Sequence, residues 1–303
     1  MPDQGDAAAV VVHYESPETL LLTLTDLGEF FPRDRIVVVD SSGDLDDSWD
    51  AGAVILRPGR NTGYARGAND GVRYLLASRP DVTEILVCTH EVRFADGVID
   101  RLLEVAQERP GGHVVAPRLV TRGVKGQAPS LWSEGGRLSF PLRHPEHVRV
   151  GRTHGTRRAL WVDGAAFVIA VRTWQRVGGI PEEFFLYMED VALGLRCRRL
   201  GEPVVVVLDA VVEQAVTGPN RYLAIRNQLI LAERYYSRLD SAVVHAQIYA
   251  KTITLALLGE RGRARAIENR RAIRDARRRV RAAAAAGDLP RPRGRAWRPD
   301  RPR

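Results

Sequence analysis

RIVVVDSSG, residues 35–43, is the stretch that decides the fold. Its run of β-branched residues predicts a strand buried on both faces, and Asp40 ends that strand just before a Ser-Ser-Gly turn. AAAVVVHY, residues 7–14, predicts a second buried strand, and Ser16-Pro17-Glu18 predicts the start of a helix that continues to about Phe31. Strand, helix and strand in this order predict a parallel pair with both carboxyl ends at one edge.

The same alternation continues along the chain. The expected strands are 53–58, 84–88, 113–117, about 160–171 and 204–209, and the expected helices are 64–78, 97–108 and one containing 173–177. This order predicts an α/β fold, a Rossmann-like and mainly parallel sheet flanked by helices. Residues 121–158 are rich in Gly, Arg, Pro and His without clear periodicity, so we expect an excursion or flexible loop there.

Composition places the chain among globular proteins. It has 303 residues, of which 45% are hydrophobic, and this is enough for a sizeable core. No apolar run approaches the roughly 20 residues needed to cross a bilayer, and the acidic start does not resemble a secretory signal, so we expect a cytoplasmic protein. Cys88 and Cys197 lie in apolar segments, where we expect buried thiols rather than a disulfide.

The positive charge is concentrated in a C-terminal tail. Residues 259–303 contain 16 Arg and five Asp or Glu, a net charge of +11, which leaves −3 for residues 1–258. The basicity is therefore no argument that the main domain binds nucleic acid. We expect a main domain over 1–240, a helical segment over 241–281 and a disordered Arg/Pro-rich tail over 282–303.

Two interpretations of the tail remain open. The mostly apolar residues 241–258 precede the basic run, and an apolar segment beside a polybasic one suits peripheral attachment to an anionic membrane surface. A packed helix followed by a solvated tail explains the sequence equally well. RNA binding is less favoured, because Trp297 is the only aromatic residue available there for stacking.

Two polar stretches follow expected strands. Asp40 is a carboxylate at the edge where α/β sheets bind ligands, although a turn residue is about as likely on position alone. RNTGYARGANDG, residues 60–71, places Gly63, Gly67 and Gly71 around Asn61 and Asn69, just after an expected strand and at a helix start. There backbone could approach a nucleotide, and the helix N-terminus favours its phosphates. The spacing matches neither the dinucleotide fingerprint nor the P-loop, and a Gly-rich helix entry is the alternative.

Five segments in order resemble family-two glycosyltransferases, especially the bacterial rhamnosyltransferase-like members. They cover about residues 8–240. The segments are the strand ending at Asp40, NTGYARGANDG (61–71), VDGAAFVIAV (162–171), VGGIPEEFFLYMED (177–190) and NRYLAIRNQLIL (220–231). Five ordered segments are more specific than any one of them.

The resemblance implies a GT-A fold, a nucleotide-diphosphate sugar donor and inverting transfer to an acceptor hydroxyl. It implies that Asp190 is the base that takes the hydroxyl proton and that Glu189 orients the site. The implied donor-binding residues are Tyr14, Glu15, Asp40, Asn61, Gly63, Tyr64, Gly67 and Asn69, and the implied acceptor-binding residues are Gly164, Phe185, Tyr187 and Arg226. Without the resemblance, two acids in the first turn of a helix would be read as partners of its dipole.

The chain departs from the family where the resemblance places a divalent cation. In CTHEV, residues 88–92, Glu91 stands where the family has a ligand Asp, two residues after Thr89. Glu213 stands where relatives often have His, and Ala192 replaces an acid. Either Glu91 and Glu213 form an altered carboxylate pair around Mg²⁺ or Mn²⁺, or the metal site is weakened.

The sequence therefore predicts an inverting glycosyltransferase. The resemblance favours a deoxythymidine or uridine diphosphate sugar as donor, and the acceptor classes are a cell-surface glycan, a lipid-linked molecule or a secondary metabolite. Two alternatives remain: a catalytically silent relative that binds nucleotide sugars or partners, and a different nucleotide-dependent transfer.

Overall fold

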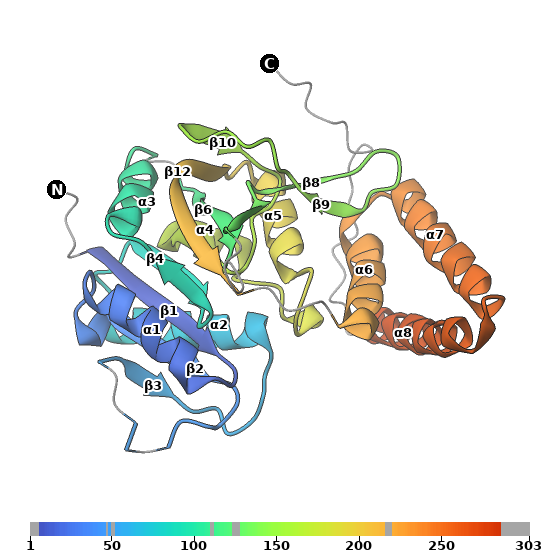
Figure 1. Cartoon of the computed structure of the whole chain (residues 1–303), viewed down its shortest axis with the longest axis horizontal. Coiled ribbons are helices and arrows are strands. Elements are labelled where there is room, and N and C mark those ends of the chain that lie inside the picture. Colours follow the sequence, from blue (N-terminus) through green and yellow to red (C-terminus); the bar gives the residue numbers. More distant parts are fainter. Residues whose placement is uncertain are drawn as a thin grey trace. The chain divides into compact units, whose positions relative to one another are not determined.

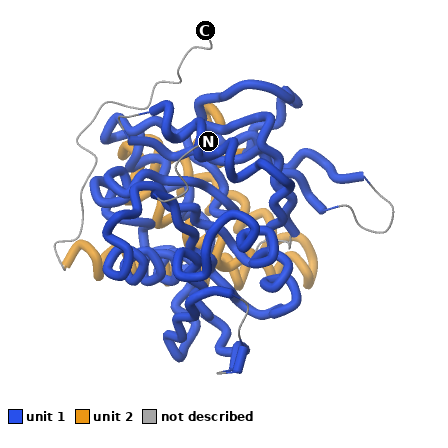
Figure 2. Tube along the Cα trace, turned by 90° about the vertical axis from the view of Figure 1, so that its left-hand side faces the viewer, with its two compact units in different colours: residues 1–137, 147–217 blue, residues 138–146, 218–303 orange. Residues whose placement is uncertain are grey.

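The computed structural model describes residues 6–46, 48–49, 52–109, 112–122, 128–215 and 220–285. The chain forms two compact units, one of residues 1–137 and 147–217 and one of residues 138–146 and 218–303 (Figures 1 and 2). The division differs from the expected boundary at 240, because the helix that follows residue 220 packs with the two C-terminal helices.

The first unit contains a ten-stranded sheet. Its main path runs β10, β12, β6, β11, β4, β1, β2, β3, while β5 pairs with β12 and β7 with β6. The strands are β1 (Ala7–His13), β2 (Ile36–Asp40), β3 (Val54–Leu56), β4 (Glu84–Thr89), β5 (Val92–Phe94), β6 (Val114–Thr121), β7 (Ser130–Ser133), β10 (Thr156–Arg158), β11 (Ala166–Ala170) and β12 (Val204–Gln214).

Strands β3, β2, β1 and β4 are parallel to one another, as the sequence predicted, and β6 and β12 form a further parallel pair. One of the expected strands, at about 160–171, runs against its neighbours in the sheet. Strand β11 lies between β4 and β6 and is antiparallel to both, with Ala166 opposite Cys88 and Val168 opposite Val115. Because β11 runs against β4, the residues just before β11 lie at the carboxyl edge of the parallel strands.

Helices cover both faces of the sheet. The alternate side chains of β1 divide between two cores, Ala7, Ala9 and Val11 in one and Ala8, Val10 and Val12 in the other. Helices α1 (Pro17–Gly28) and α3 (Val98–Gln107) pack in the first core, and α2 (Tyr64–Ser78), α4 (Val171–Val177) and α5 (Glu189–Leu200) pack in the second. A strand buried on both faces is what the apolar runs predicted.

The expected loop over 121–158 contains short strands. Besides β7 and β10, β8 (Gly136–Leu138) and β9 (Pro145–His147) form a separate two-stranded sheet. Strands of three or four residues are too short to show a period of two in the sequence, and this is why the stretch reads as irregular. Residues 123–127 lie outside the described residues.

The second unit is built on three helices, α6 (Arg221–Tyr235), α7 (Arg238–Ala256) and α8 (Gly259–Ala285). Asn220 caps α6 and Ser237 caps α7. Helix α8 extends four residues past the expected end at 281, and the rest of the predicted disordered tail, 286–303, lies outside the described residues. None of the described helices has both the length and the apolar character needed to cross a membrane.

Both cysteines are buried free thiols, as expected.

Candidate functional site

The loop after β2 is organised by Asp40. Its carboxylate accepts hydrogen bonds from the backbone N–H groups of Ser42 (3.1 Å), Gly43 (2.8 Å) and Leu45 (3.2 Å). The side chain is 1% exposed. These are the contacts of the turn alternative, and a role for Asp40 in nucleotide binding stays a prediction.

A histidine lies beside this loop. The Nε2 of His13, at the end of β1, is 2.8 Å from the Asp44 carboxylate, which also accepts a bond from the Ser42 hydroxyl (2.6 Å). Ligand atoms of His13, Asp40 and Asp44 lie within 4.8 Å of one another, the one group of three possible metal ligands among the described residues. The sequence did not predict this group, because His13 lies 31 residues before Asp44 and meets it only in the folded chain.

Gly63 and Tyr64 join the glycine-rich segment to the FFLYMED segment. The Tyr64 N–H donates to the Phe185 carbonyl at 2.8 Å, and a Cβ added to Gly63 would lie 2.4 Å from that oxygen. The Tyr64 hydroxyl donates to the Gly164 carbonyl at 2.5 Å. Three of the resembling segments therefore meet in space, and Gly63 is required by close packing as well as by its φ of +81°.

Gly67, Asn69 and Gly71 of this segment make packing contacts and hydrogen bonds within the protein. Added Cβ atoms would lie 3.2 Å from Val12 at Gly67 and 2.5 Å from Val10 at Gly71, so these glycines bring α2 close to β1. Asn69 exchanges hydrogen bonds with the backbone of Ile180, at 2.9 Å in each direction. The predicted nucleotide contacts of Gly67 and Asn69 stay predictions, whereas their observed partners are protein atoms.

Asn61 accepts a bond from the Gly63 N–H at 2.9 Å and so shapes the turn before α2.

The acid pair begins α5. The Asp190 carboxylate accepts a hydrogen bond from the N–H group of Val191 at 2.7 Å. Removal from water and the nearby Asp163 carboxylate raise the pKa of Asp190 to about 6. Burial and the Asp190 charge raise the pKa of Glu189 well above its ordinary range, and its Oε2 has no hydrogen-bond partner among the described residues.

Burial, followed by the charge of Glu189, also raises the pKa of Tyr64 well above its ordinary value, so this hydroxyl stays protonated. A carboxylate with a pKa near neutrality beside a protonated carboxyl and a phenol is suited to accept a proton from a hydroxyl.

Backbone strain gathers in the two loops of the predicted site. Left-handed φ angles occur at Glu15 (62°) and Ser16 (55°) after β1, and at Phe185 (72°), Tyr187 (70°) and Met188 (75°) before α5. Non-glycine residues rarely adopt this conformation, and such strain concentrates where ligands bind. Tyr14, beside the first of these loops, is exposed.

Sequence reasoning missed a cluster around Asp163. The Trp132 indole N–H donates to Asp163 at 3.1 Å, and His147 Nδ1 lies 3.4 Å from the same carboxylate oxygen. The ring of His147 contacts the rings of both Trp132 and Trp161. The sequence could have indicated this cluster only through Asp163 in VDGAAF. Its partners Trp132 and His147 come from residues 121–158, which show no recognisable pattern.

Of the predicted metal ligands, Glu91 lies in the turn between β4 and β5, and Glu213 lies on β12, which pairs with β5. The Ala215 N–H donates to the Glu91 carbonyl, and Glu213 lies opposite Arg93 where β12 pairs with β5. Burial raises the pKa of Glu91 against the opposing effect of Arg122. Arg93 itself forms two bonds with Asp26, at 2.7 and 2.8 Å.

Arg226 belongs to the second unit. It is 5% exposed, its Nε donates to the Asn227 side chain at 2.9 Å, and its guanidinium lies over the Tyr222 ring. Its predicted role in acceptor binding stays a prediction.

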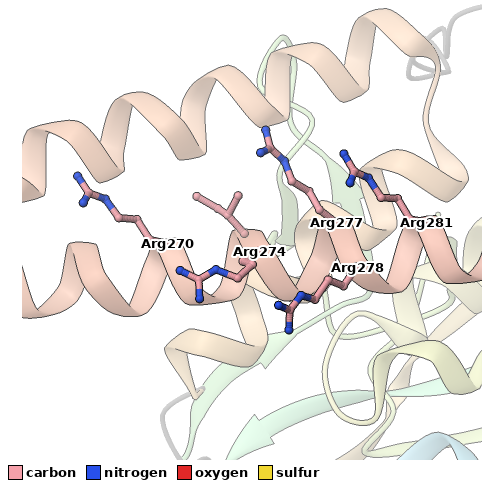
Figure 3. Close-up of a pocket in the computed structure, with 6 residues that line it drawn as sticks. Arg270, Arg274, Arg277, Arg278 and Arg281 are labelled. Carbon is pink, nitrogen blue, oxygen red and sulfur yellow. The ribbon is translucent and has the colours of Figure 1, made fainter.

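The second unit also has an arginine-lined groove of about 390 Å³ on α8. Figure 3 shows its labelled guanidinium groups along one stretch of the helix. The lining residues are Arg270, Ile273, Arg274, Arg277, Arg278 and Arg281, with no acid among them.

Comparison with solved structures identifies the fold. The chain superimposes on GalNAc-T7, in a crystal structure with UDP, GalNAc and Mn²⁺, with a TM-score of 0.62 and 12% identity over 82% of this chain and 50% of that one. The chain has a GT-A glycosyltransferase fold. The chain also superimposes on the mannosyltransferase PcManGT of Pyrobaculum calidifontis, in complex with GDP-Man and Mn²⁺. That match has a TM-score of 0.50 and 17% identity, and it covers 94% of this chain and 76% of the mannosyltransferase.

The chain is also similar in sequence to named glycosyltransferases. The chain is 29% identical over 166 residues to the N-acetylglucosaminyl-diphospho-decaprenol L-rhamnosyltransferase of Mycobacterium tuberculosis, covering 48% of this chain and 53% of the relative. It is 25% identical over 249 residues to the low-salt glycan biosynthesis hexosyltransferase Agl10 of Haloferax volcanii, covering 77% of each.

These relatives confirm the resemblance to glycosyltransferases predicted from the motifs. The chain spans about half the length of the rhamnosyltransferase. No model of a known protein family matches the chain.

Proposed function

We propose that this chain transfers a sugar from a nucleotide-diphosphate donor to an acceptor hydroxyl with inversion of configuration. The observation that carries the proposal is the junction of Tyr64, Gly164 and Phe185 beside the Glu189–Asp190 pair. This junction lies at the carboxyl edge of the sheet, where α/β folds bind ligands.

In the proposed reaction Asp190 is the general base. The acceptor oxygen attacks the anomeric carbon while the bond from that carbon to the diphosphate oxygen breaks, and the hydroxyl proton passes to the Asp190 carboxylate. Inversion follows because attack and departure occur on opposite faces of the sugar. Glu189, kept protonated by its burial, orients the site, and Phe185 with Tyr187 walls it from water.

The donor sits, in this proposal, along the loops after β1 and β2 and at the start of α2. Tyr14 and Glu15 border the first loop, while Asp40 and Asn61 shape the other two. We favour a deoxythymidine or uridine diphosphate sugar.

We further propose that a divalent cation, Mg²⁺ or Mn²⁺, supports departure of the diphosphate. Glu91 fits such an ion because its carboxylate is a hard oxygen donor at the sheet edge. Burial raises the pKa of Glu91, so its negative charge is poorly stabilised by the protein and a bound cation would stabilise it. Glu213 fits less well, since Arg93 lies opposite it. The His13 group also fits less well, because its Asp40 and Asp44 oxygens already accept internal hydrogen bonds. A bound cation would neutralise the charge that develops on the diphosphate.

The acceptor that we favour is lipid-linked, and we place the reaction in the cytoplasm at the inner face of the membrane. Support comes from the second unit, where Ile253, Leu257 and Leu258 are exposed near the turn between α7 and α8. The arginine groove of α8 supplies positive charge in the same unit. Exposed apolar side chains together with basic ones suit contact with anionic lipid.

A transfer assay tests the proposed activity. Nucleotide sugars of several bases and sugars are incubated with the protein, Mn²⁺ and a prenyl diphosphate-linked acceptor, and released nucleoside diphosphate is measured. We expect release that depends on the acceptor. Donor binding without release under every condition would instead support the catalytically silent alternative.

A further inference from the structure

A pocket of about 310 Å³ lies at the amino edge of the sheet, opposite to the edge of the proposed transfer site. Strand β4 begins at this edge, β6 begins just after His113, and the antiparallel β11 ends there, so Glu84, His113 and Ala170 meet in the lining. The pocket opens to solvent through exposed lining residues, which are Thr83, Gln107, Arg172 and Gln175. Its volume is that of a site for a small ligand.

The acid of this pocket is already paired. Glu84 Oε2 is 2.9 Å from His113 Nε2, and Nδ1 of the same ring is 3.2 Å from the Arg109 carbonyl. Because both ring nitrogens lie beside acceptors, the ring satisfies both only as an imidazolium that donates on each side. His113 is 2% exposed and Glu84 8%, so the imidazolium offsets the carboxylate with little screening by water.

Two guanidinium groups of the lining, those of Arg109 and Arg172, have no such partner. Within the described part of the chain neither of them has a hydrogen bond or an ion pair, and Arg109 Nε is buried as well. A buried N–H without an acceptor is costly, and an acceptor on a ligand would remove that cost. Glu202 lies beside the lining residue Gly112 but is already bound by Arg176. The pocket therefore has two uncompensated positive charges.

We propose that this pocket binds the phosphate group of a small hydroxylated ligand through Arg109 and Arg172. A phosphate dianion matches two positive charges, and its oxygens accept paired N–H bonds from a planar guanidinium. Because His113 offsets the charge of Glu84, this carboxylate can accept a ligand hydroxyl beside the phosphate. A sugar phosphate supplies both groups, whereas inorganic phosphate supplies one. The site is separate from the acid pair and does not depend on sugar transfer by the protein.

NMR spectroscopy of the full chain locates such binding without an assay of transfer. Inorganic phosphate and glucose 1-phosphate are titrated while the amide signals of Thr83, Gly112 and Gln175 are followed, and sodium chloride at equal ionic strength is the control. These signals separate the pocket from the arginine groove of α8. We expect saturable shifts, with glucose 1-phosphate bound about tenfold more tightly because of its hydroxyl bond to Glu84. Shifts of the same size in chloride would overturn the proposal.

Two variants test the guanidinium groups. Arg109→Gln and Arg172→Gln should each weaken phosphate binding at these amides by about tenfold, because each removes a charge-assisted contact. Since neither arginine has an internal ion pair to lose, both variants should fold and melt near the wild-type temperature. Arg199→Gln, at an exposed arginine in the last turn of α5 outside the pocket, is the matched control. Phosphate affinity that stays at the control value in both variants would refute the assignment.

A lipid headgroup is the other source of phosphate, and monomeric dihexanoyl phosphatidylglycerol is the probe for it. The proposal expects the soluble phosphates to shift the pocket amides at lower concentration than this lipid does. Shifts with the lipid alone would assign the pocket to a headgroup and overturn the proposal. Saturable binding of glucose 1-phosphate in a protein that transfers no sugar would leave this site standing and remove the proposed function.

Discussion

The N–H of Tyr64 donates a 2.8 Å hydrogen bond to the carbonyl of Phe185, and this bond joins the start of α2 to the strained loop before the acid pair. The carbonyl can reach Tyr64 only because Gly63 has no side chain in the way. The motifs that we propose for donor and acceptor binding are thus held together by backbone atoms, so changes at Gly63 should affect both.

The Gly63→Ala variant tests this junction. The new Cβ would lie 2.4 Å from the Phe185 carbonyl and 2.6 Å from its ring, so we expect a loss of about 2 to 4 kcal/mol in the free energy of unfolding, with weaker transfer. Gly97→Ala is the matched control, because Gly97 also precedes a helix with positive φ but has no atom within 4 Å of the added Cβ. It should lose only about 1 kcal/mol. Equal losses in thermal or chemical denaturation would refute the packing role.

Replacing Asp190 tests the base. Asp190→Asn keeps the size of the side chain but removes its basicity, so turnover should fall by about 10² to 10⁴ while donor affinity stays nearly constant. Steady-state transfer and donor titration measure the two quantities. Glu189→Gln should be milder, because Glu189 is already held protonated. Near-normal turnover in Asp190→Asn would exclude it as the base.

The raised pKa of Asp190 has a consequence for stability. Its value of about 6 in the folded protein lies above the ordinary 3.8, so the folded state loses stability as pH rises from about 4 to 6 and this carboxyl ionises. Asp190→Asn should therefore be more stable than the wild type by about 1 to 2 kcal/mol at pH 7.5. The difference should shrink toward pH 4.

A control of opposite sign is available at Asp209. Burial opposes the charged form of Asp209, but the hydrogen bond from Arg101 and the positive charge of Arg101 together with smaller effects lower its pKa, so its charge stabilises the fold above pH 4. Asp209→Asn should be less stable than the wild type at pH 7.5, and this difference should also fade in acid. Thermal denaturation at several pH values follows both variants, and a destabilised Asp190→Asn at pH 7.5 would contradict the argument.

Cation dependence is the next expectation. EDTA should abolish transfer, Mn²⁺ or Mg²⁺ should restore it, and Glu91→Gln should raise the cation concentration needed, as measured by titrating Mn²⁺ against rate. Glu213→Gln is the comparison and should have the smaller effect, since Arg93 lies opposite Glu213. Transfer that continues unchanged in EDTA would exclude a required cation. Arg93 could then neutralise the diphosphate only by giving up its hydrogen bonds to Asp26.

Lipid binding should depend on two kinds of side chain in the second unit. Replacing both Leu257 and Leu258 by Ser should weaken binding to vesicles that contain phosphatidylglycerol, and Arg270→Gln with Arg274→Gln should weaken it by about 2 kcal/mol, or about 30-fold. Leu239→Ser, at an equally exposed leucine near the other end of α7, is the control. Vesicle sedimentation with and without the anionic lipid measures the effect, and equal binding by all variants would refute this surface.

Sequence patterns predicted the parts of the fold that are long and buried. The strands ending at His13 and Asp40 and the helix from Tyr64 were placed within a residue or two, because each is continuous and strongly apolar or clearly periodic. The direction of β11 was not predictable, since an antiparallel strand buried on both faces has the same apolar run as a parallel one.

The candidate site shows the same limit. Asp190 could be proposed from the sequence because a short motif carries it. His147 was not, because its significance depends on Trp132, Trp161 and Asp163, which the fold brings to it from elsewhere in the chain. The arrangement of a site from distant segments leaves no local pattern.

Gly67 and Gly71 matter for how relatives of this chain are judged. Both glycines are needed to seat α2 against β1, whether or not a sugar is ever transferred. Selection for a stable fold would keep them in a descendant that had lost its catalytic acid. The glycine spacing is therefore a poor marker of activity among relatives, and under the proposed mechanism the residue at position 190 is the better one to compare.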